Sequence, residues 1–327
     1  MFYRQLGKLQ SEITAALCLN LPTGLTQMKR VTFIGLGNMG LPMALNLSKA
    51  GYRVHGHDIV PEVTLRAAAG GLAVVDRSEA ALADADIAIT MLPAGADVIA
   101  AYRGALLPAA RPGTLFIDCS TIDVASANLA HSLATAAGMR ALDAPVSGGV
   151  TGATAATLTF MVGGAAEDVE TARPLLEAMG RRIIHCGGPG LGQAAKICNN
   201  MILGASMIAV CEAFVLAERL GLGHQALFDV AAVSSGQCWA LTTYCPVPGP
   251  VPTSPANREY HPGFAAALML KDLDLAQEAA AAVGADTVLG RTARDLYRAF
   301  AEDGGAARDF SAIVEAIRKG NALLPTA

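Results

Sequence analysis

The stretch Val31-Thr32-Phe33-Ile34-Gly35-Leu36-Gly37-Asn38-Met39-Gly40 gives the clearest indication of the fold. A short apolar run ends in a glycine-rich turn, and helix-forming residues follow the turn as far as Ala50. Gly35 permits a tight turn, Gly37 lets the backbone approach a pyrophosphate, and Gly40 lets the helix pack closely on the strand. Because the first amides of a helix favour an anion, this stretch predicts a dinucleotide site.

A second predicted strand, Arg53–His57, ends next to Asp58, which lies 18 residues past Gly40. An acid at this place accepts hydrogen bonds from the ribose hydroxyls of NAD and repels the 2′-phosphate of NADP. No arginine follows it, since Ile59-Val60-Pro61 come next. The sequence therefore predicts NAD as the cofactor. The alternative is a glycine turn in an ordinary α/β fold, with Asp58 capping the next helix.

From Val31 to about Ile184, β-branched runs alternate with alanine-rich segments, which predicts βαβ units and a mainly parallel, Rossmann-type sheet. The candidate strands are Val31–Gly35, Arg53–His57, Ile87–Met91, Leu115–Asp118, Arg140–Leu142, Thr157–Val162 and Arg182–His185. The candidate helices between them are Asn38–Ala50, Pro61–Ala69, Ala94–Tyr102, Asp123–Ala137 and Ala166–Met179.

After Gly192 the pattern becomes helical throughout, beginning with one long run, Gln193–Leu220. The further candidate helices are His224–Ser234, Phe264–Ala282, Ala285–Ala301 and Asp309–Lys319. We expect an extension over residues 1–28 that is disordered or artefactual, with translation starting at Met28. A NAD-binding domain over 29–190 and an all-helical substrate and oligomerisation domain over 191–327 follow it.

Composition excludes several classes of function. The chain has 327 residues, of which 53% are hydrophobic and 16% charged, so it is not a disordered protein. A formal net charge of −4 argues against a nucleic-acid partner. We expect no membrane span. Seven scattered cysteines without a C-x-x-C pair indicate free thiols in a reducing compartment, and we expect no metal site. The seven are Cys18, Cys119, Cys186, Cys198, Cys211, Cys238 and Cys245.

Two motifs carry the chemistry. The first is Asp143-Ala144-Pro145-Val146-Ser147-Gly148-Gly149-Val150, in which the Ser147 hydroxyl and the amides of Gly148 and Gly149 form a possible anion cradle. The second is Gly187-x-x-Gly190-x-Gly192-x-x-x-Lys196-x-x-x-Asn200, which puts a lysine and an amide on one helical face. A lysine flanked by apolar residues is a candidate general acid or base. The ordinary alternatives are a solvated lysine and a plain loop.

In these motifs and their order, from about Lys29 onwards, the chain resembles the β-hydroxyacid dehydrogenase family. The resemblance implies NAD-dependent oxidation of a small 3-hydroxyacid, with Lys196 as catalytic acid/base. Ser147, Gly148 and Gly149 would bind the substrate carboxylate, and Asn200 would orient the substrate. It also implies a homodimer or homotetramer that forms through the helical domain. We expect a cytoplasmic protein, or one of the mitochondrial matrix if the source is eukaryotic.

Within the family, the chain is most similar to the branch that oxidises 3-hydroxyisobutyrate to methylmalonate semialdehyde in valine degradation. The residues that carry this likeness are Ser234-Ser235-Gly236-Gln237-Cys238-Trp239, Tyr244-Cys245-Pro246-Val247-Pro248-Gly249, Tyr260-x-x-Gly263-Phe264 and Lys271-Asp272-Leu273. The likeness implies that Trp239 and Phe264 wall the apolar side of the pocket.

The same likeness places several residues at the cofactor. Phe264 and Lys271 would lie at its nicotinamide end, with Lys271 paired to Asp272. Leu92-Pro93, and Thr121 in the segment Cys119-Ser120-Thr121, would also touch it. Ala156, where glycine is usual, and Cys245, where asparagine is common, depart from the family pattern and put the substrate preference in doubt.

Three alternatives stay open. The first is a tartronate or succinate semialdehyde reductase of the same family. The second is a sugar-phosphate dehydrogenase such as 6-phosphogluconate dehydrogenase, which the scarcity of arginine in the C-terminal part disfavours. The third is a nucleotide-binding protein without catalysis, which has no use for Lys196 and Asn200 together.

Overall fold

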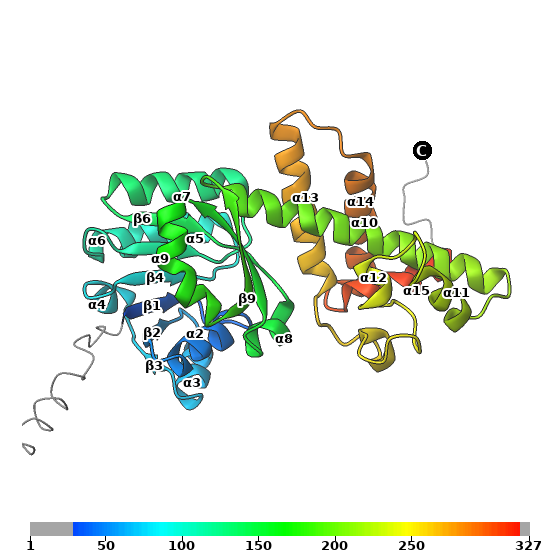
Figure 1. The fold of residues 1–327 in the computed structure, drawn as a ribbon, viewed down its shortest axis with the longest axis horizontal. Helices are drawn as coiled ribbons and strands as arrows, with labels where there is room; N and C mark the ends of the chain where they lie inside the picture. Colours follow the sequence, from blue (N-terminus) through cyan, green and yellow to red (C-terminus); the bar gives the residue numbers. More distant parts are fainter. Residues whose placement is uncertain (1–28, 321–327) are drawn as a thin grey trace, which may run out of the picture.

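The computed structural model describes residues 29–320, which form a sheet-containing half followed by a helical half (Figure 1). The extension expected over residues 1–28 lies outside the described residues. The long helix α10 (Leu191–Arg219) leaves the sheet half and runs through the helical half (Figure 1). The predicted order of a Rossmann-type sheet and then helices is confirmed.

The sheet has nine strands in the order β3-β2-β1-β4-β5-β6-β8-β7, with β9 paired to β8. The strands are β1 (Arg30–Ile34), β2 (Arg53–His57), β3 (Ala73–Val74), β4 (Ile87–Thr90), β5 (Leu115–Asp118), β6 (Arg140–Asp143), β7 (Val146–Ser147), β8 (Leu158–Gly164) and β9 (Gly180–Gly187). The six strands β3, β2, β1, β4, β5 and β6 are all parallel. The strand order reverses at β1, which lies between β2 and β4. The carboxyl ends on either side of this reversal of strand order are where open α/β sheets bind ligands.

Helices cover both faces of the sheet. In chain order they are α2 (Gly40–Lys49), α3 (Pro61–Ala69), α4 (Ser78–Leu82), α5 (Gly95–Ala101), the π-helical turn η1 (Tyr102–Leu106), α6 (Leu107–Ala109), α7 (Val124–Ala136), α8 (Gly149–Thr154) and α9 (Ala166–Glu177). One apolar core joins α2, α3, α8 and α9 to the sheet. A second joins α4, α5, η1 and α7 to the opposite face. Burial on both faces explains why the central strands β4 and β5 are apolar without alternation.

The helical half has one core of its own, built around α10. Its other elements are α11 (His224–Ala231), α12 (Trp239–Thr242), the 3₁₀ turn η2 (Pro255–Arg258), α13 (Ala266–Ala282), α14 (Val288–Phe300), η3 (Ala301–Gly305), the 3₁₀ turn η4 (Phe310–Ala312) and α15 (Ile313–Lys319). By length and composition α10 could cross a membrane, but half of its most apolar stretch is buried inside this protein. The buried part of α10 packs against α13, α14 and α15.

The predicted elements differ from the observed ones in a few places. The sheet is mainly parallel, as predicted, and β8 runs antiparallel to β6 and β7. The two-residue strands β3 and β7 and the short helix α4 were not predicted. The helix expected over Asp309–Lys319 starts later, because the Asp309 carboxylate caps the turn η4 that precedes α15.

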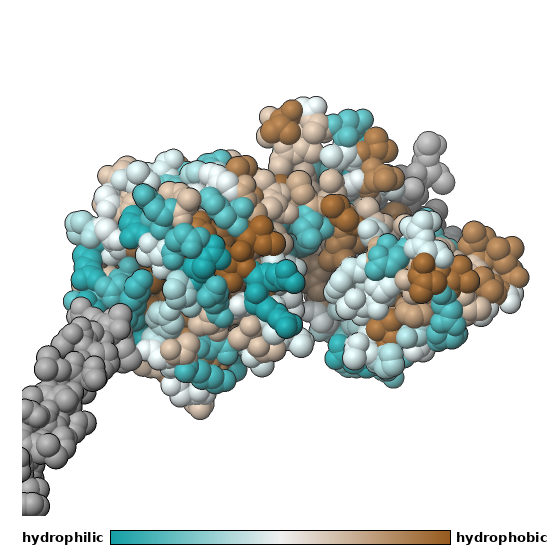
Figure 2. Space-filling view, viewed as in Figure 1, coloured by the Kyte–Doolittle hydropathy of each residue, from teal (hydrophilic) through white to brown (hydrophobic). Residues whose placement is uncertain are grey.

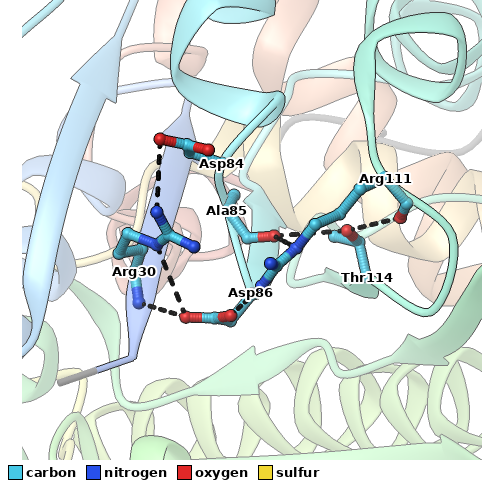
Figure 3. A network of polar contacts seen from close by, with 6 residues as sticks. All are labelled: Arg30, Asp84, Ala85, Asp86, Arg111 and Thr114. Carbon is cyan, nitrogen blue, oxygen red and sulfur yellow. Dashed lines mark hydrogen bonds and ion pairs between the residues drawn. The ribbon is translucent and has the colours of Figure 1, made fainter. Parts of the chain in front are cut away.

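A network of polar side chains lies at the amino-terminal ends of β1 and β4 (Figure 3). These ends are opposite the carboxyl ends described above. The Arg30 guanidinium lies 3.2 Å from the Asp84 carboxylate, and the Arg30 amide donates to the Asp86 carboxylate at 2.8 Å. Arg111 pairs with Asp86 from the segment before β5. These groups are partly exposed, so we assign them a stabilising role at this edge worth about 1 kcal/mol or less for each pair.

Candidate active site

The glycine turn between β1 and α2 leaves room where a dinucleotide would lie. Gly35 has φ +91°, and a Cβ there would lie 2.2 Å from the Met91 carbonyl oxygen. A Cβ on Gly40 would lie 1.9 Å from the Gly35 carbonyl oxygen, so both positions require glycine. A Cβ on Gly37 would meet nothing within 4 Å. No side chain caps the start of α2 at Met39. The turn therefore fits a bound pyrophosphate.

Asp58 joins this turn to the next one. Its carboxylate accepts from the Leu36 amide at 2.7 Å and from the Val60 amide at 2.9 Å. Each carboxylate oxygen has a second lone pair, so both can still accept from a ribose hydroxyl. The alternative of a helix cap is not what the structure shows, because α3 is capped at Val60 without a side-chain hydrogen bond.

Hydrogen bonds connect the loops after β4 and β5, which hold the other predicted cofactor contacts. The Leu92 amide donates to the Ser120 hydroxyl at 2.8 Å, and Ser120 in turn donates to Asp118 at 2.6 Å. Thr121 follows directly and is half-buried, as is Leu92, whereas Pro93 is exposed. The structure brings Leu92, Pro93 and Thr121 to the carboxyl edge of the sheet, where the glycine turn also lies.

Two buried side chains join α10 to this edge. Asp143 accepts from the Gly190 amide at 2.8 Å and the Gln193 amide at 2.9 Å, so it caps the helix with a negative charge. The Gln193 side chain donates to the Ser120 carbonyl at 2.7 Å and accepts from the Ile122 amide at 3.2 Å. A Cβ on Gly192 would lie 2.4 Å from the Met161 carbonyl oxygen, so α10 begins in tight contact with β8.

Lys196 lies one turn further along α10 and is only 7% exposed. Burial lowers the pKa of its ammonium group, the Asp272 carboxylate partly opposes this, and Lys271 adds to it. A lysine in such surroundings can exchange a proton at lower pH than a solvated one. The alternative of a solvated lysine is therefore wrong, while the catalytic role of Lys196 stays a prediction.

Both the nitrogen and the oxygen of the Asn200 side-chain amide form hydrogen bonds. Its Nδ2 donates to the Asp272 carboxylate of α13, and its Oδ1 accepts from the Asn199 side chain at 2.9 Å. Asn200 is 2% and Asp272 5% exposed. The predicted pairing of Lys271 with Asp272 is not found among the ion pairs of residues 29–320. Neighbouring helical residues point in different directions, and Asp272 faces Asn200 instead.

Lys271 contacts the sheet half. Its Nζ donates to the Pro93 carbonyl at 2.7 Å, across the space between α13 and the loop after β4. Burial lowers the pKa of Lys271 as well, opposed by Asp272, Asp118 and Asp97. The structure thus places Lys271 against the Leu92-Pro93 segment. The prediction that all three residues contact the cofactor needs them to lie close together in this way.

The predicted carboxylate cradle lies where the two halves meet. Ser147 ends β7, which pairs with β8 through Ser147 and Thr159. Gly148 and Gly149 have φ of +136° and +62° and open the short helix α8. A Cβ on Gly149 would lie 3.4 Å from the Gly263 carbonyl oxygen of the helical half. Since α10 also begins against β8, the cradle and Lys196 lie on neighbouring elements.

Aromatic side chains continue from Gly263 into the helical half. Trp239 is 49% exposed and stacks on Tyr244 with ring centroids 4.9 Å apart. The Tyr244 hydroxyl donates to Asp309 at 2.8 Å. Phe264 is half-buried and meets Phe310 edge to face at 5.7 Å. Trp239 is thus linked to the cradle through Tyr244 and Gly263.

The two departures from the family pattern lie in different places. Ala156 has φ +55°, between α8 and β8, where a residue without Cβ is favoured. The Cys245 side chain is fully buried in the core of the helical half, and burial raises the pKa of its thiol. The change at Ala156 therefore affects the backbone conformation, and the change at Cys245 affects the core of the helical half.

Three supporting residues were missed or misjudged from the sequence: Gln193, Asp272 and Asp309. Asp309 is fully buried and accepts from Tyr244, from the amides of Gly263 and Phe264, and from Ser311. Gln193 is a polar side chain in a mostly apolar stretch, which was a usable signal, whereas Asp272 and Asp309 have charged neighbours in the sequence. Their partners lie far away along the chain, which no local spacing reveals.

The fold and these contacts define a nicotinamide-dependent dehydrogenase with a Rossmann-type half. Family models support this reading. The model for the NAD binding domain of 6-phosphogluconate dehydrogenase matches residues 30–188. The model for the NAD-binding part of NADP-dependent 3-hydroxyisobutyrate dehydrogenase matches residues 190–317.

Individual relatives are similar over most of their length. A probable 3-hydroxyisobutyrate dehydrogenase of Mycobacterium tuberculosis is 56% identical over 291 residues, which is 89% of this chain and 98% of the relative. An NAD-dependent L-serine dehydrogenase of Pseudomonas aeruginosa is 48% identical over 288 residues, 88% of this chain and 97% of that one. The solved structure of Mycobacterium tuberculosis 3-hydroxyisobutyrate dehydrogenase with L-serine has a TM-score of 0.87 at 56% identity, covering 89% of this chain and 100% of that chain.

The chain belongs to the 3-hydroxyisobutyrate dehydrogenase family of NAD-dependent oxidoreductases. The relatives differ in the substrate that their names give, so the identity of the substrate is a separate question.

Proposed function

We propose that the protein oxidises 3-hydroxyisobutyrate to methylmalonate semialdehyde, with NAD as the acceptor, in valine degradation. The observation that carries the proposal is the buried Lys196, one helical turn before Asn200. It lies near the start of α10, which begins against β8, and β8 pairs with the strand that ends at Ser147. When bound, NAD accepts a hydride from the alcohol carbon.

The chain's own residues would bind the substrate and move its proton. Ser147 and the amides of Gly148 and Gly149 would hold the carboxylate. The hydroxyl would face Lys196, whose Nζ takes the hydroxyl proton as the C=O bond forms. Asn200 has one amide hydrogen and one lone pair that are not used by Asp272 and Asn199, so it could orient the same hydroxyl.

L-serine is the second candidate, because one relative is named for it and another was solved with it. The two acids differ at the carbon next to the carboxylate, where serine has an ammonium group and 3-hydroxyisobutyrate a methyl group. An ammonium group needs an anionic partner when buried. Both oxygens of Asp309 are already occupied, and Trp239, Tyr244 and Phe264 present aromatic surface. These contacts favour the methyl group.

A substrate panel tests the proposal. We expect the highest kcat/KM with NAD for 3-hydroxyisobutyrate. Loss of the methyl group in 3-hydroxypropionate should cost about 1–3 kcal/mol, or roughly 10- to 200-fold. Glycerate and 4-hydroxybutyrate should be poorer than 3-hydroxyisobutyrate. A clear preference for L-serine, glycerate or 4-hydroxybutyrate would assign another reaction of the same family.

We also propose a cytoplasmic homodimer or homotetramer that associates through the helical half. Hydrophobic patches, brown in Figure 2, at the end of α10 and α11 and at the α13–α14 turn support association through the helical half. The residues there include Leu220 at 75%, Val233 at 86% and Val283 at 79% exposed. Large exposed apolar patches mark interaction sites. Sedimentation at micromolar concentration should give a mass of two or four chains, and a single chain would contradict the proposal.

A further inference from the structure

Among residues 29–320, Asp272 is the carboxylate that hydrogen-bonds to the Asn200 side chain. The carboxylate lies on α13, while Lys196 and Asn200 lie one turn apart on α10, and the two helices pack against each other. All three side chains are at least nine-tenths buried. Burial of such a carboxylate costs free energy unless neighbouring groups form hydrogen bonds or ion pairs with it.

The hydrogen bond decides which way the Asn200 amide faces. An ionised carboxylate accepts hydrogen bonds and cannot donate them. Asp272 therefore selects the amide orientation with Nδ2 towards α13, and Oδ1 is then directed to the Asn199 side chain. An asparagine at position 272 could accept or donate, so it would allow Asn200 to flip without changing the volume of the site.

Charge gives Asp272 a second effect. Of the groups that act on Lys196, Asp272 raises the pKa of the lysine while burial and Lys271 lower it. In return, Lys196 and Lys271 oppose the burial that raises the pKa of Asp272. Removal of the Asp272 charge should therefore lower the pKa of Lys196, leaving Lys271 as the remaining charged neighbour.

We propose that Asp272 is a positioning residue of the active site, which orients the Asn200 amide on the helical face that also carries Lys196. This inference rests on the proposed function. It predicts an effect on the proton-transfer step and not on folding alone, because Asp272 acts through two groups that face the substrate.

The test is Asp272→Asn, with Asp274→Asn as the matched control. Asp274 is two residues further on α13, carries the same charge and pairs with Arg298 at 2.6 Å. In Asp272→Asn, kcat for 3-hydroxyisobutyrate should fall by about 10- to 100-fold, as a misplaced catalytic group does. The rise of kcat/KM with pH should move to lower pH, because the base loses its proton more easily. Asp274→Asn should match the wild type in both.

Coupling to Asn200 is tested by a double-mutant cycle. In the Asn200→Ala background, Asp272→Asn should change kcat by less than about twofold at the pH plateau, since the orienting contact is already gone. A kcat of Asp272→Asn within twofold of wild type, an unmoved pH profile, or full additivity in the cycle overturns the proposal. If Asp272→Asn does not fold, Asp272→Ser is measured by the same criteria. A wild-type protein that oxidises no 3-hydroxyacid would instead remove the proposed function itself.

Discussion

Ala156 has a backbone conformation that an L-residue rarely adopts. Its φ of +55° lies in the left-handed region, which costs an L-residue roughly 1–2 kcal/mol. The strain lies at the turn from α8 into β8, the strand that carries both the Ser147 pairing and the start of α10. The main effect of alanine in place of the family's glycine should therefore be on the free energy of unfolding and not on catalysis.

Ala156→Gly should stabilise the protein by about 1 kcal/mol, because glycine adopts this conformation without the clash of Cβ, less a small entropic cost in the unfolded chain. Urea unfolding followed by circular dichroism measures the change. Ala155→Gly is the control, since Ala155 has φ −83° and should gain nothing from the change. A less stable Ala156→Gly protein would contradict this reading of the turn.

Asp118 is fully buried, and burial raises the pKa of its carboxyl group to about 6, against the hydrogen bonds from Ser120 and Thr90. The folded protein therefore holds this proton more tightly than the unfolded chain. The protonated Asp118 carboxyl group therefore contributes to the free energy of unfolding. This contribution is fully present below the unfolded pKa of 3.8 and is lost as pH rises through about 6.

Asp118→Asn cannot ionise, so its stability relative to the wild type should increase between pH 4 and pH 8 by up to about 3 kcal/mol. Urea unfolding of both proteins without cofactor, at both pH values, gives this difference. If the difference between the two proteins is the same at pH 4 and pH 8, the Asp118 carboxyl group is not the origin of the effect.

At the scale of elements, the carboxyl edge of the sheet collects the predicted cofactor contacts. The glycine turn, Asp58 and the loops after β4 and β5 all follow parallel strands. Local patterns revealed these elements, because an apolar run, a glycine turn and an amphipathic segment are close together in the sequence. The strands β3 and β7 were missed because two residues are too few to show a period.

Long-range contacts explain what the sequence could not show. Lys196 and Asn200 were found from their spacing on one helix. Asp272, which contacts Asn200, comes 72 residues later on another helix. Its neighbour Lys271 contacts the Pro93 carbonyl, and its place at the cofactor stays a prediction. The expected ion pair between Lys271 and Asp272 is not found among the described residues, because Asp272 faces Asn200. Side-chain partners across a fold follow from packing and not from spacing.

Asp58→Ala tests the predicted preference for NAD. The wild type should use NADP with at least about tenfold lower kcat/KM, equal to about 1.4 kcal/mol. The variant should narrow this gap, and it should also bind NAD more weakly because the Leu36 amide loses its acceptor. Asp84→Ala, at the opposite edge of the sheet, should change neither value (Figure 3). Equal use of both cofactors by the wild type would contradict the assignment.

For the whole molecule, the candidate site needs both halves. Lys271 reaches Pro93, Gly263 lies against Gly149, and α10 begins on β8. The division into domains over 29–190 and 191–327 stays a prediction. The joint site means that a change in how the halves meet should alter substrate and cofactor binding together.

Uptake of the substrate's hydroxyl proton by Lys196 is the step on which the proposed function depends. Its most direct test is NADH formation from 3-hydroxyisobutyrate by Lys196→Ala and by Lys196→Arg, which keeps the charge but cannot act as a base at working pH. Both variants should lose about 10²- to 10⁴-fold in kcat, while the Kd for NAD stays within threefold of wild type. A kcat within threefold of wild type in either variant would contradict the claim.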